Sequence, residues 1–141
     1  MIGYINWRRY KMSFQVMTGD QEVRLNISGW TAALTLRKEI KIPYSSIEEI
    51  RVGKFHFPWA AAIKRTGITT TGYKAGIFII EDKKYFLVYH HADEVVMLQL
   101  KGCEFDHVVF ESENPKQVVH EMMRNCPSIN LKDNAHKEDE I

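Results

Sequence analysis

The chain lacks any long apolar run. None of its 141 residues belongs to an uninterrupted apolar stretch of about 18 residues, the length that suggests a membrane-spanning helix. The opening Met1-Ile2-Gly3-Tyr4 also lacks the basic start, apolar stretch and small-residue cleavage site of a signal peptide. We therefore expect a cytoplasmic protein, and a peripheral association with the membrane stays open.

The chain also has few cysteines and a low net charge. Two widely spaced cysteines, Cys103 and Cys126, do not make a disulfide framework, which favours a reducing compartment. The formal net charge is +1, whereas a nucleic-acid binder needs a strong positive footprint. The hydrophobic fraction of 45% is ordinary for a folded protein, so we expect one globular domain and no nucleic-acid partner.

The sequence shows no catalytic constellation. The acidic residues lie mainly in turns or at strand ends, and Gly67, Gly72 and Gly76 are too widely spaced for a phosphate-binding loop. His90 and His91 are neighbours on a predicted strand and point to opposite faces, so they do not converge on a metal. We expect no catalytic residue, no metal site, no cofactor and no enzymatic activity.

Most of the chain shows the alternation of apolar and polar residues that is typical of half-buried strands. In 22–27, for example, Val23, Leu25 and Ile27 alternate with Arg24 and Asn26. Turn signals separate the segments. The predicted strands cover 22–27, 33–36, 40–42, 47–52, 76–80, 84–90, 95–100 and 105–110.

The pattern changes to a helical one after Asn114. Asn114 is a good N-cap, Pro115 is tolerated at the first helical position, and Gln117 stands where a capping box needs it. The apolar residues that follow recur at helical spacing and form one stripe. They are Val118, Val119, Met122 and Met123. The helix is predicted to end at Asn125-Cys126-Pro127.

Many short strands followed by one amphipathic helix predict a mainly β (α+β) domain. We expect a partly open antiparallel β-barrel of about seven strands, capped by one C-terminal α-helix. Residues 1–21 are interpreted as an N-terminal arm or leader, 22–126 as the domain, and 127–141 as a flexible C-terminal tail.

Several short motifs resemble those of bacterial pleckstrin-homology (PH) domains. They occur in the same order along roughly 22–126, and the order and spacing are more specific than any single motif. The motifs are Ile42-Pro43-Tyr44-Ser45-Ser46-Ile47, Lys64-Arg65-Thr66-Gly67, Gly72-Tyr73, Gly76-Ile77-Phe78, Val108 to Phe110, and Glu113-Asn114-Pro115. The resemblance implies a PH-like fold.

The resemblance implies little about the ligand, because a fold does not fix a function. Phosphoinositide-binding relatives carry a dense basic cluster on the first hairpin turn. Here only Arg37 and Lys38 stand at that turn, and Glu39 follows at once. Phosphoinositide binding is therefore not carried over.

Residues 54–75 interrupt the strand pattern and are interpreted as a long loop that is both basic and aromatic. The segment holds four cations and no acidic residue. Its candidate binding residues are Lys54, Phe55, Phe57, Trp59, Lys64, Arg65, Tyr73 and Lys74. Rings and cations together can engage an anionic membrane surface or a protein partner. In the alternative interpretation the rings cover the barrel and the cations are only solvated.

The sequence therefore favours a non-enzymatic binding module that contacts an unknown protein partner or an anionic membrane surface through residues 54–75. The main alternative is a structural domain that self-associates into a homo-oligomer through exposed strand edges. A small-molecule enzyme comes third, without support from any motif.

Overall fold

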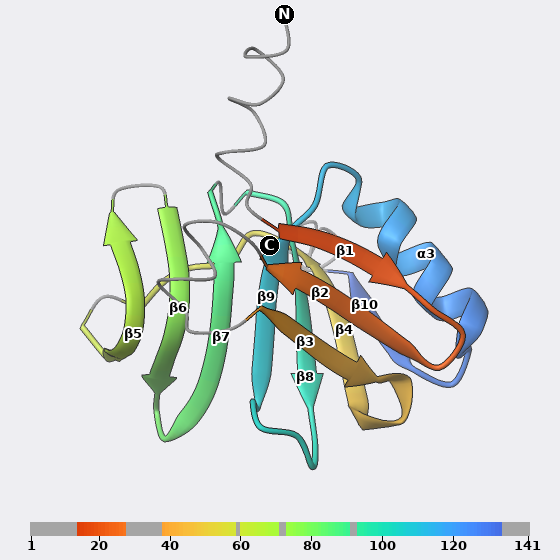
Figure 1. The fold of residues 1–141 in the computed structure, drawn as a ribbon, viewed down its shortest axis with the longest axis horizontal. Coiled ribbons are helices and arrows are strands. Elements are labelled where there is room, and N and C mark those ends of the chain that lie inside the picture. Colours follow the sequence, from red (N-terminus) through yellow and green to blue (C-terminus); the bar gives the residue numbers. More distant parts are fainter. Residues whose placement is uncertain (1–13, 28–37, 59, 71–72, 91–92, 134–141) are drawn as a thin grey trace, which may run out of the picture.

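The computed structural model describes residues 14–27, 38–58, 60–70, 73–90 and 93–133. Within these residues the chain forms ten strands, one short 3-10 helix and one α-helix (Figure 1). In chain order they are β1 (Phe14–Thr18), β2 (Glu22–Ile27), β3 (Glu39–Pro43), η1 (Tyr44–Ser46), β4 (Ile47–Gly53), β5 (Ala62–Thr70), β6 (Tyr73–Ile80), β7 (Lys83–Tyr89), β8 (Val95–Leu100), β9 (His107–Glu111), α3 (Pro115–Asn125) and β10 (Asn130–Asp133).

The strands form two sheets that do not join into a closed barrel. The smaller has the order β1-β2-β3, and the larger has the order β10-β4-β8-β9-β7-β6-β5. The smaller sheet lies in front of one half of the larger, with α3 beside it, and β5 stands at the opposite end (Figure 1). The predicted mainly β fold, partly open and with one C-terminal helix, is confirmed.

The prediction that all strands are antiparallel is wrong for two pairs. β7 pairs with β9 in parallel, and β10 pairs with β4 in parallel. The β8–β9 hairpin accounts for the first pair, because β9 pairs with both β8 and β7 and so lies between them. The second pair forms after α3 has carried the chain back to the β4 edge, as parallel pairing requires.

The strands predicted from alternation are confirmed wherever the structure describes them. β2 and β8 match the predicted bounds, 22–27 and 95–100. The predicted strand over 33–36 lies outside the described residues. β1 and β10 fall in the segments 1–21 and 127–141, which the sequence analysis treated as arm and tail, so ordered strands extend beyond the predicted domain limits.

The interpretation of 54–75 as one long loop is wrong. Residues Ala62–Thr70 form the nine-residue strand β5, which pairs antiparallel with β6 as far as Thr70↔Tyr73. Glycine at position 67 and the two adjacent cations weaken the strand signal. The exposed side chains of Lys64 and Arg65 are compatible with a strand, because β5 stands at the end of the described sheet, where it needs only one neighbour.

The main core lies between the two sheets. Its side chains come from alternate positions of both sheets, because successive residues of a strand point to opposite faces. The largest fully buried ones include Leu25, Ile42, Ile50, Phe86, Leu98, Phe110 and Met122. A second cluster covers the other face of the larger sheet, which we call the outer face; it contains Phe78, Ile80, Leu87, Tyr89, Val95 and Val109.

Helix α3 begins as the sequence predicts. The Asn114 side chain accepts a hydrogen bond from the Gln117 backbone N–H at 3.2 Å and donates one to Gln117 Oε1 at 3.1 Å. Val119 and Met122 are buried against the main core. In the part of the chain that the structure describes, no helix is long and apolar enough to cross a membrane.

Candidate functional site

Residues 54–58, which we call the strap, lead from β4 toward β5 across the outer face. Phe55 contacts two rings of β7: its centroid lies 5.8 Å from that of Tyr89 and 6.3 Å from that of Tyr85. Phe57 meets Phe78 of β6 edge to face, with the centroids 5.3 Å apart. Edge-to-face contacts of this kind stabilise a fold beyond the area that they bury.

The strap therefore turns two of its aromatic residues toward the sheet. Phe55 and Phe57 are half-buried and pack against the outer-face cluster. Their contacts support the interpretation in which these rings cover the barrel. They leave each ring with only part of its surface for a partner.

Lys74 is one of the segment's predicted binding residues, and its side chain is only 4% exposed. Its ammonium lies 5.1 Å from the centre of the Phe57 ring, a cation–π contact. Desolvation by burial lowers the pKa of Lys74 below its usual value. Lys74 therefore belongs to the structure beneath the strap and offers little surface to a ligand.

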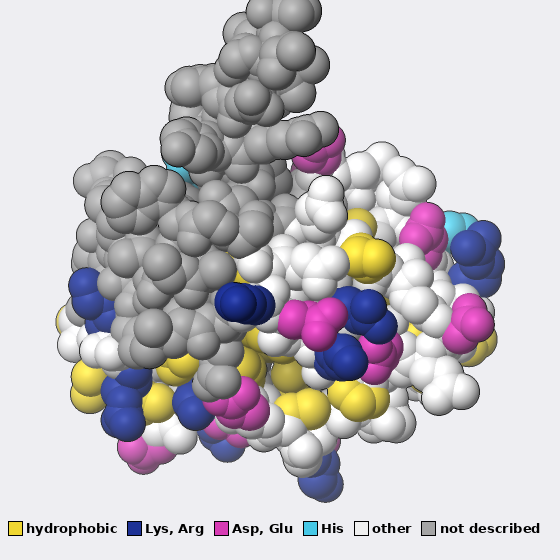
Figure 2. Space-filling view, in the orientation of Figure 1, with side chains coloured by type: hydrophobic (Ala, Val, Ile, Leu, Met, Phe, Trp, Pro, Cys, Tyr) yellow, Lys and Arg dark blue, Asp and Glu magenta, His cyan; other side chains and the backbone are white. Residues whose placement is uncertain are grey.

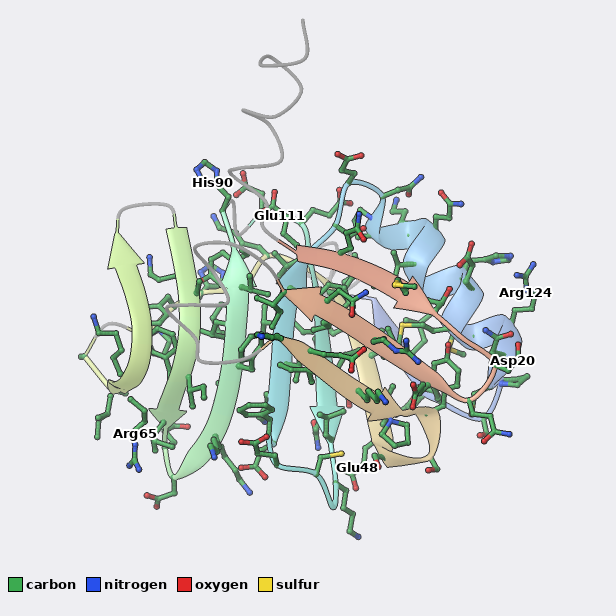
Figure 3. The ribbon with its side chains drawn as sticks, viewed as in Figure 1. Asp20, Glu48, Arg65, His90, Glu111 and Arg124 are labelled. Carbon is green, nitrogen blue, oxygen red and sulfur yellow. The ribbon has the colours of Figure 1, made fainter. Side chains whose placement is uncertain are left out.

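The segment is also exposed at the start of β5. Ile63 is 62% exposed, and Lys64 and Arg65 are exposed beside it. The register with β6 shifts between Lys64 and Thr66, so Arg65 is the extra residue of a bulge. Figure 3 shows Arg65 pointing away from the sheet at one end of β5. We call Ile63, Lys64 and Arg65 the β5 patch; on that side of the molecule, cationic and hydrophobic side chains lie next to each other (Figure 2).

The structure does not bring all the predicted cations together. Lys54 is exposed but directly follows β4, which stands five places from β5 in the sheet. Lys54 therefore stands apart from Lys64 and Arg65 in the chain, at the far end of the strap from β5. Trp59 and the side chain of Tyr73 lie outside the described residues.

The remaining candidates for chemistry do not assemble. Among the described residues, no group of three or more His, Cys, Asp or Glu side chains is placed to hold a metal ion. The His90 backbone N–H donates to Glu111 Oε1, and His91 lies outside the described residues. Cys103 and Cys126 are both free thiols and partly exposed.

Comparison with known protein families identifies the family of this chain. Residues 21–125, which make up most of the chain, match the family described as bacterial PH domain. The chain belongs to this family. No curated protein and no solved structure matched this bacterial PH domain. PH domains are in general binding modules without catalytic activity.

The sequence analysis did not predict a set of aromatic and charged side chains that lie together on the outer face of this bacterial PH domain. The His107 ring of β9 stacks on the Tyr85 ring of β7, with centroids 4.4 Å apart and planes inclined by 17°. Arg51 and Glu49 of β4 line a small depression together with these two rings. Alternation identified these strands correctly. It could not identify the contacts, because β7 and β9 are neighbours only through the parallel pairing.

Burial lowers the pKa of His107 below its usual value of 6.5; nearby Lys83 acts in the same direction, whereas Asp106 and Glu49 oppose it. The unfolded chain then takes up a proton from pH about 6.5 downward, whereas the folded domain takes it up only at a lower pH. We expect the free energy of unfolding to fall as the pH drops from about 7 to about 5. In urea titrations, His107→Gln should show a weaker fall than the wild type.

The exposed His120 of α3 supplies the matched control. His120→Gln should keep the wild-type difference between the two pH values. An equal fall in the wild type and in His107→Gln would contradict the assignment of this pH dependence to His107.

Proposed function

We propose that this bacterial PH domain is a non-enzymatic binding module that takes an acidic segment of a protein partner along the outer edge of β5. One observation carries the proposal: among the strands that the structure describes, the nine-residue β5 is the end strand of the larger sheet. The main chain of an end strand offers donors and acceptors to an added strand, which is a common mode of peptide recognition.

The charges at the start of β5 favour an acidic partner. Lys64 and Arg65 are exposed there and would pair with carboxylates of the added segment, which supports orientation and selectivity. The exposed turn Glu81-Asp82 follows Ile80, the strand partner of Ala62. A flat anionic surface would meet these acidic residues too, whereas an extended segment along β5 need not. The geometry therefore favours a protein partner over a membrane.

An anionic membrane surface is the second candidate, and Ile63 supports it. This side chain is 62% exposed and lies directly before two cations. An apolar side chain that enters the lipid interface, with cations at the headgroups, is a typical mode of peripheral binding. On either reading we place the domain in the cytoplasm.

The test is selection of random peptides from a displayed library against the wild-type domain, with hydrogen exchange on the complex. We expect extended acidic peptides whose binding slows amide exchange in Ala62–Thr70. The double variant Lys64→Glu with Arg65→Glu should weaken binding about tenfold or more, because opposite charge becomes like charge. Lys38→Glu with Lys41→Glu, which reverses two exposed cations elsewhere, should bind like the wild type.

Three further results decide between the alternatives. Peptides that bind without slowing exchange in β5 would overturn strand addition. Salt-sensitive cosedimentation with phosphatidylglycerol vesicles, lost in the β5 double variant and without any peptide binding, would favour the membrane. A mass above that of the monomer in light scattering, lost in the same double variant, would show that the strand comes from a second copy.

A further inference from the structure

A second surface lies on the outer face, away from the β5 patch. It is a depression of ≈ 150 Å³ whose lining comes from β4, β7, β8, β9 and the strap. We call it the outer-face depression. Four strands and the strap meet there, so side chains that are distant in the sequence line one small hollow.

Aromatic rings form one wall of the depression. Tyr85 and His107 stack nearly in parallel, and Phe55 stands tilted by 47° to Tyr85. All three rings are partly buried, and Phe55 and Tyr85 pack against the outer-face cluster. A further aromatic ring can make stacked or edge-to-face contacts with such a wall, each worth about 0.5–1.5 kcal/mol beyond the area buried.

The two charged side chains that line the depression form an ion pair without net charge. Arg51 donates from Nη2 and Nε to Glu49 Oε2, at 2.8 and 3.0 Å, so the two charges neutralise each other. Both side chains stay partly exposed, at 31% and 18%. His107 adds no charge at neutral pH because its pKa is lowered. Gln99 contributes an exposed amide, whose Nε2 donates to Glu48 Oε1 at 3.2 Å. The rim thus carries no excess positive charge and suits a neutral group that both donates and accepts hydrogen bonds.

The size of the depression decides between a free small molecule and a side chain. Sites for small molecules usually have volumes of about 300–1,000 Å³ and enclose most of the ligand. A hollow of ≈ 150 Å³ is comparable to a cavity that holds a single benzene ring. A ring anchored in such a hollow while the rest of its molecule stays outside is the usual geometry of an aromatic hot spot in a protein interface.

We propose that the outer-face depression takes one aromatic side chain, tyrosine or tryptophan, from a protein partner. The ring lies against Phe55 and the Tyr85–His107 stack, and its hydroxyl or indole N–H meets the Arg51–Glu49 pair and Gln99. The inference rests on the proposed role as a protein-binding module but does not depend on the β5 patch.

The probes are N-acetyl-tyrosinamide and N-acetyl-tryptophanamide, neutral mimics of the two side chains within a peptide. In NMR titrations we expect them to shift the signals of Tyr85, His107 and Gln99, with dissociation constants of about millimolar size. N-acetyl-leucinamide should shift these signals much less. Equal shifts with the leucine probe, or none with the aromatic probes, would overturn the proposal.

Two tryptophan variants test whether the probes bind in the outer-face depression. Gln99→Trp places a tethered ring at the mouth of the depression and should weaken probe binding about tenfold. Gln15→Trp, at an exposed strand position of the smaller sheet, makes the same change elsewhere and should leave binding unchanged. Equal weakening in both variants would contradict a site in the depression. Both folds are checked by the dispersion of their amide spectra.

A fourth probe separates the partner's side chain from a free metabolite. N-acetyl-tyrosine keeps its carboxylate, and a rim without excess positive charge should bind it no better than the amide. Markedly tighter binding of the acid would overturn the choice of a protein side chain and favour a small aromatic acid. Because the variant pair Lys64→Glu with Arg65→Glu does not touch the depression, failure at β5 and failure here remain distinguishable.

Discussion

Replacement of Leu98 by alanine is expected to lower the free energy of unfolding by about 2–5 kcal/mol. Leu98 is 1% exposed and lies in β8, between β4 and β9, with its side chain in the main core. The substitution removes the transfer free energy of the deleted atoms and leaves a cavity that a sandwich of two sheets can close only in part. Urea unfolding followed by circular dichroism measures the change.

Leu131 of β10 is the matched control for this prediction. It is 48% exposed, so the same Leu→Ala change should shift the free energy of unfolding by about 0.5 kcal/mol or less. Equal losses for the two variants would mean that the sheets do not enclose the core around Leu98.

A chain that ends at Pro127 is expected to be less stable than one that ends at Asp133, by about 2 kcal/mol or more. The shorter chain loses Ile129, which is 6% exposed within the main core. It also loses β10, and the edge of β4 that β10 occupies is then exposed to water. The unfolding midpoints of the two chains in urea give the difference.

The variant Ile129→Ala in the longer chain separates the two contributions. It should account for most of the loss, because burial of an apolar side chain outweighs a few main-chain hydrogen bonds exchanged with water. Identical midpoints for the two chain lengths would place the end of the folded domain before Ile129, close to the predicted limit at residue 126.

Regular alternation in the sequence was enough to locate the central strands. Val23, Leu25 and Ile27 alternate with polar residues, and all three are buried while Arg24 and Asn26 are partly exposed. The capped start of α3 could also be predicted from the sequence, since Asn114 and Gln117 interact within one turn. These features depend on neighbours in the sequence, which the sequence displays directly.

The elements at the margins could not be predicted in this way. β5 contains a bulge at Arg65, which breaks the alternation, and only its pairing with β6 shows it to be a strand. β10 has four residues, and Leu131 within it is exposed, so the segment has little apolar signal of its own. Such strands depend on partners far along the chain.

The candidate site could be predicted from the sequence only in part, for the same reason. The composition of 54–75 pointed to Lys64 and Arg65, which are exposed in the structure. It could not show that Phe55 and Phe57 would turn inward, or that Lys74 would lie beneath Phe57. The Tyr85–His107 stack depends on the parallel pairing of β7 and β9, which strand periodicity does not reveal.

The larger sheet has more strands than the smaller one and extends beyond it, which affects the cooperativity of unfolding. β8 is held by a strand on each side, whereas β5 pairs with β6 alone among the described strands. Segments with few buried contacts open at lower free energy than the core and form separate unfolding units. The end of the sheet that carries β5 can therefore open locally while the sandwich around Leu98 stays folded. Binding of a partner at β5 then need not lower the free energy of global unfolding.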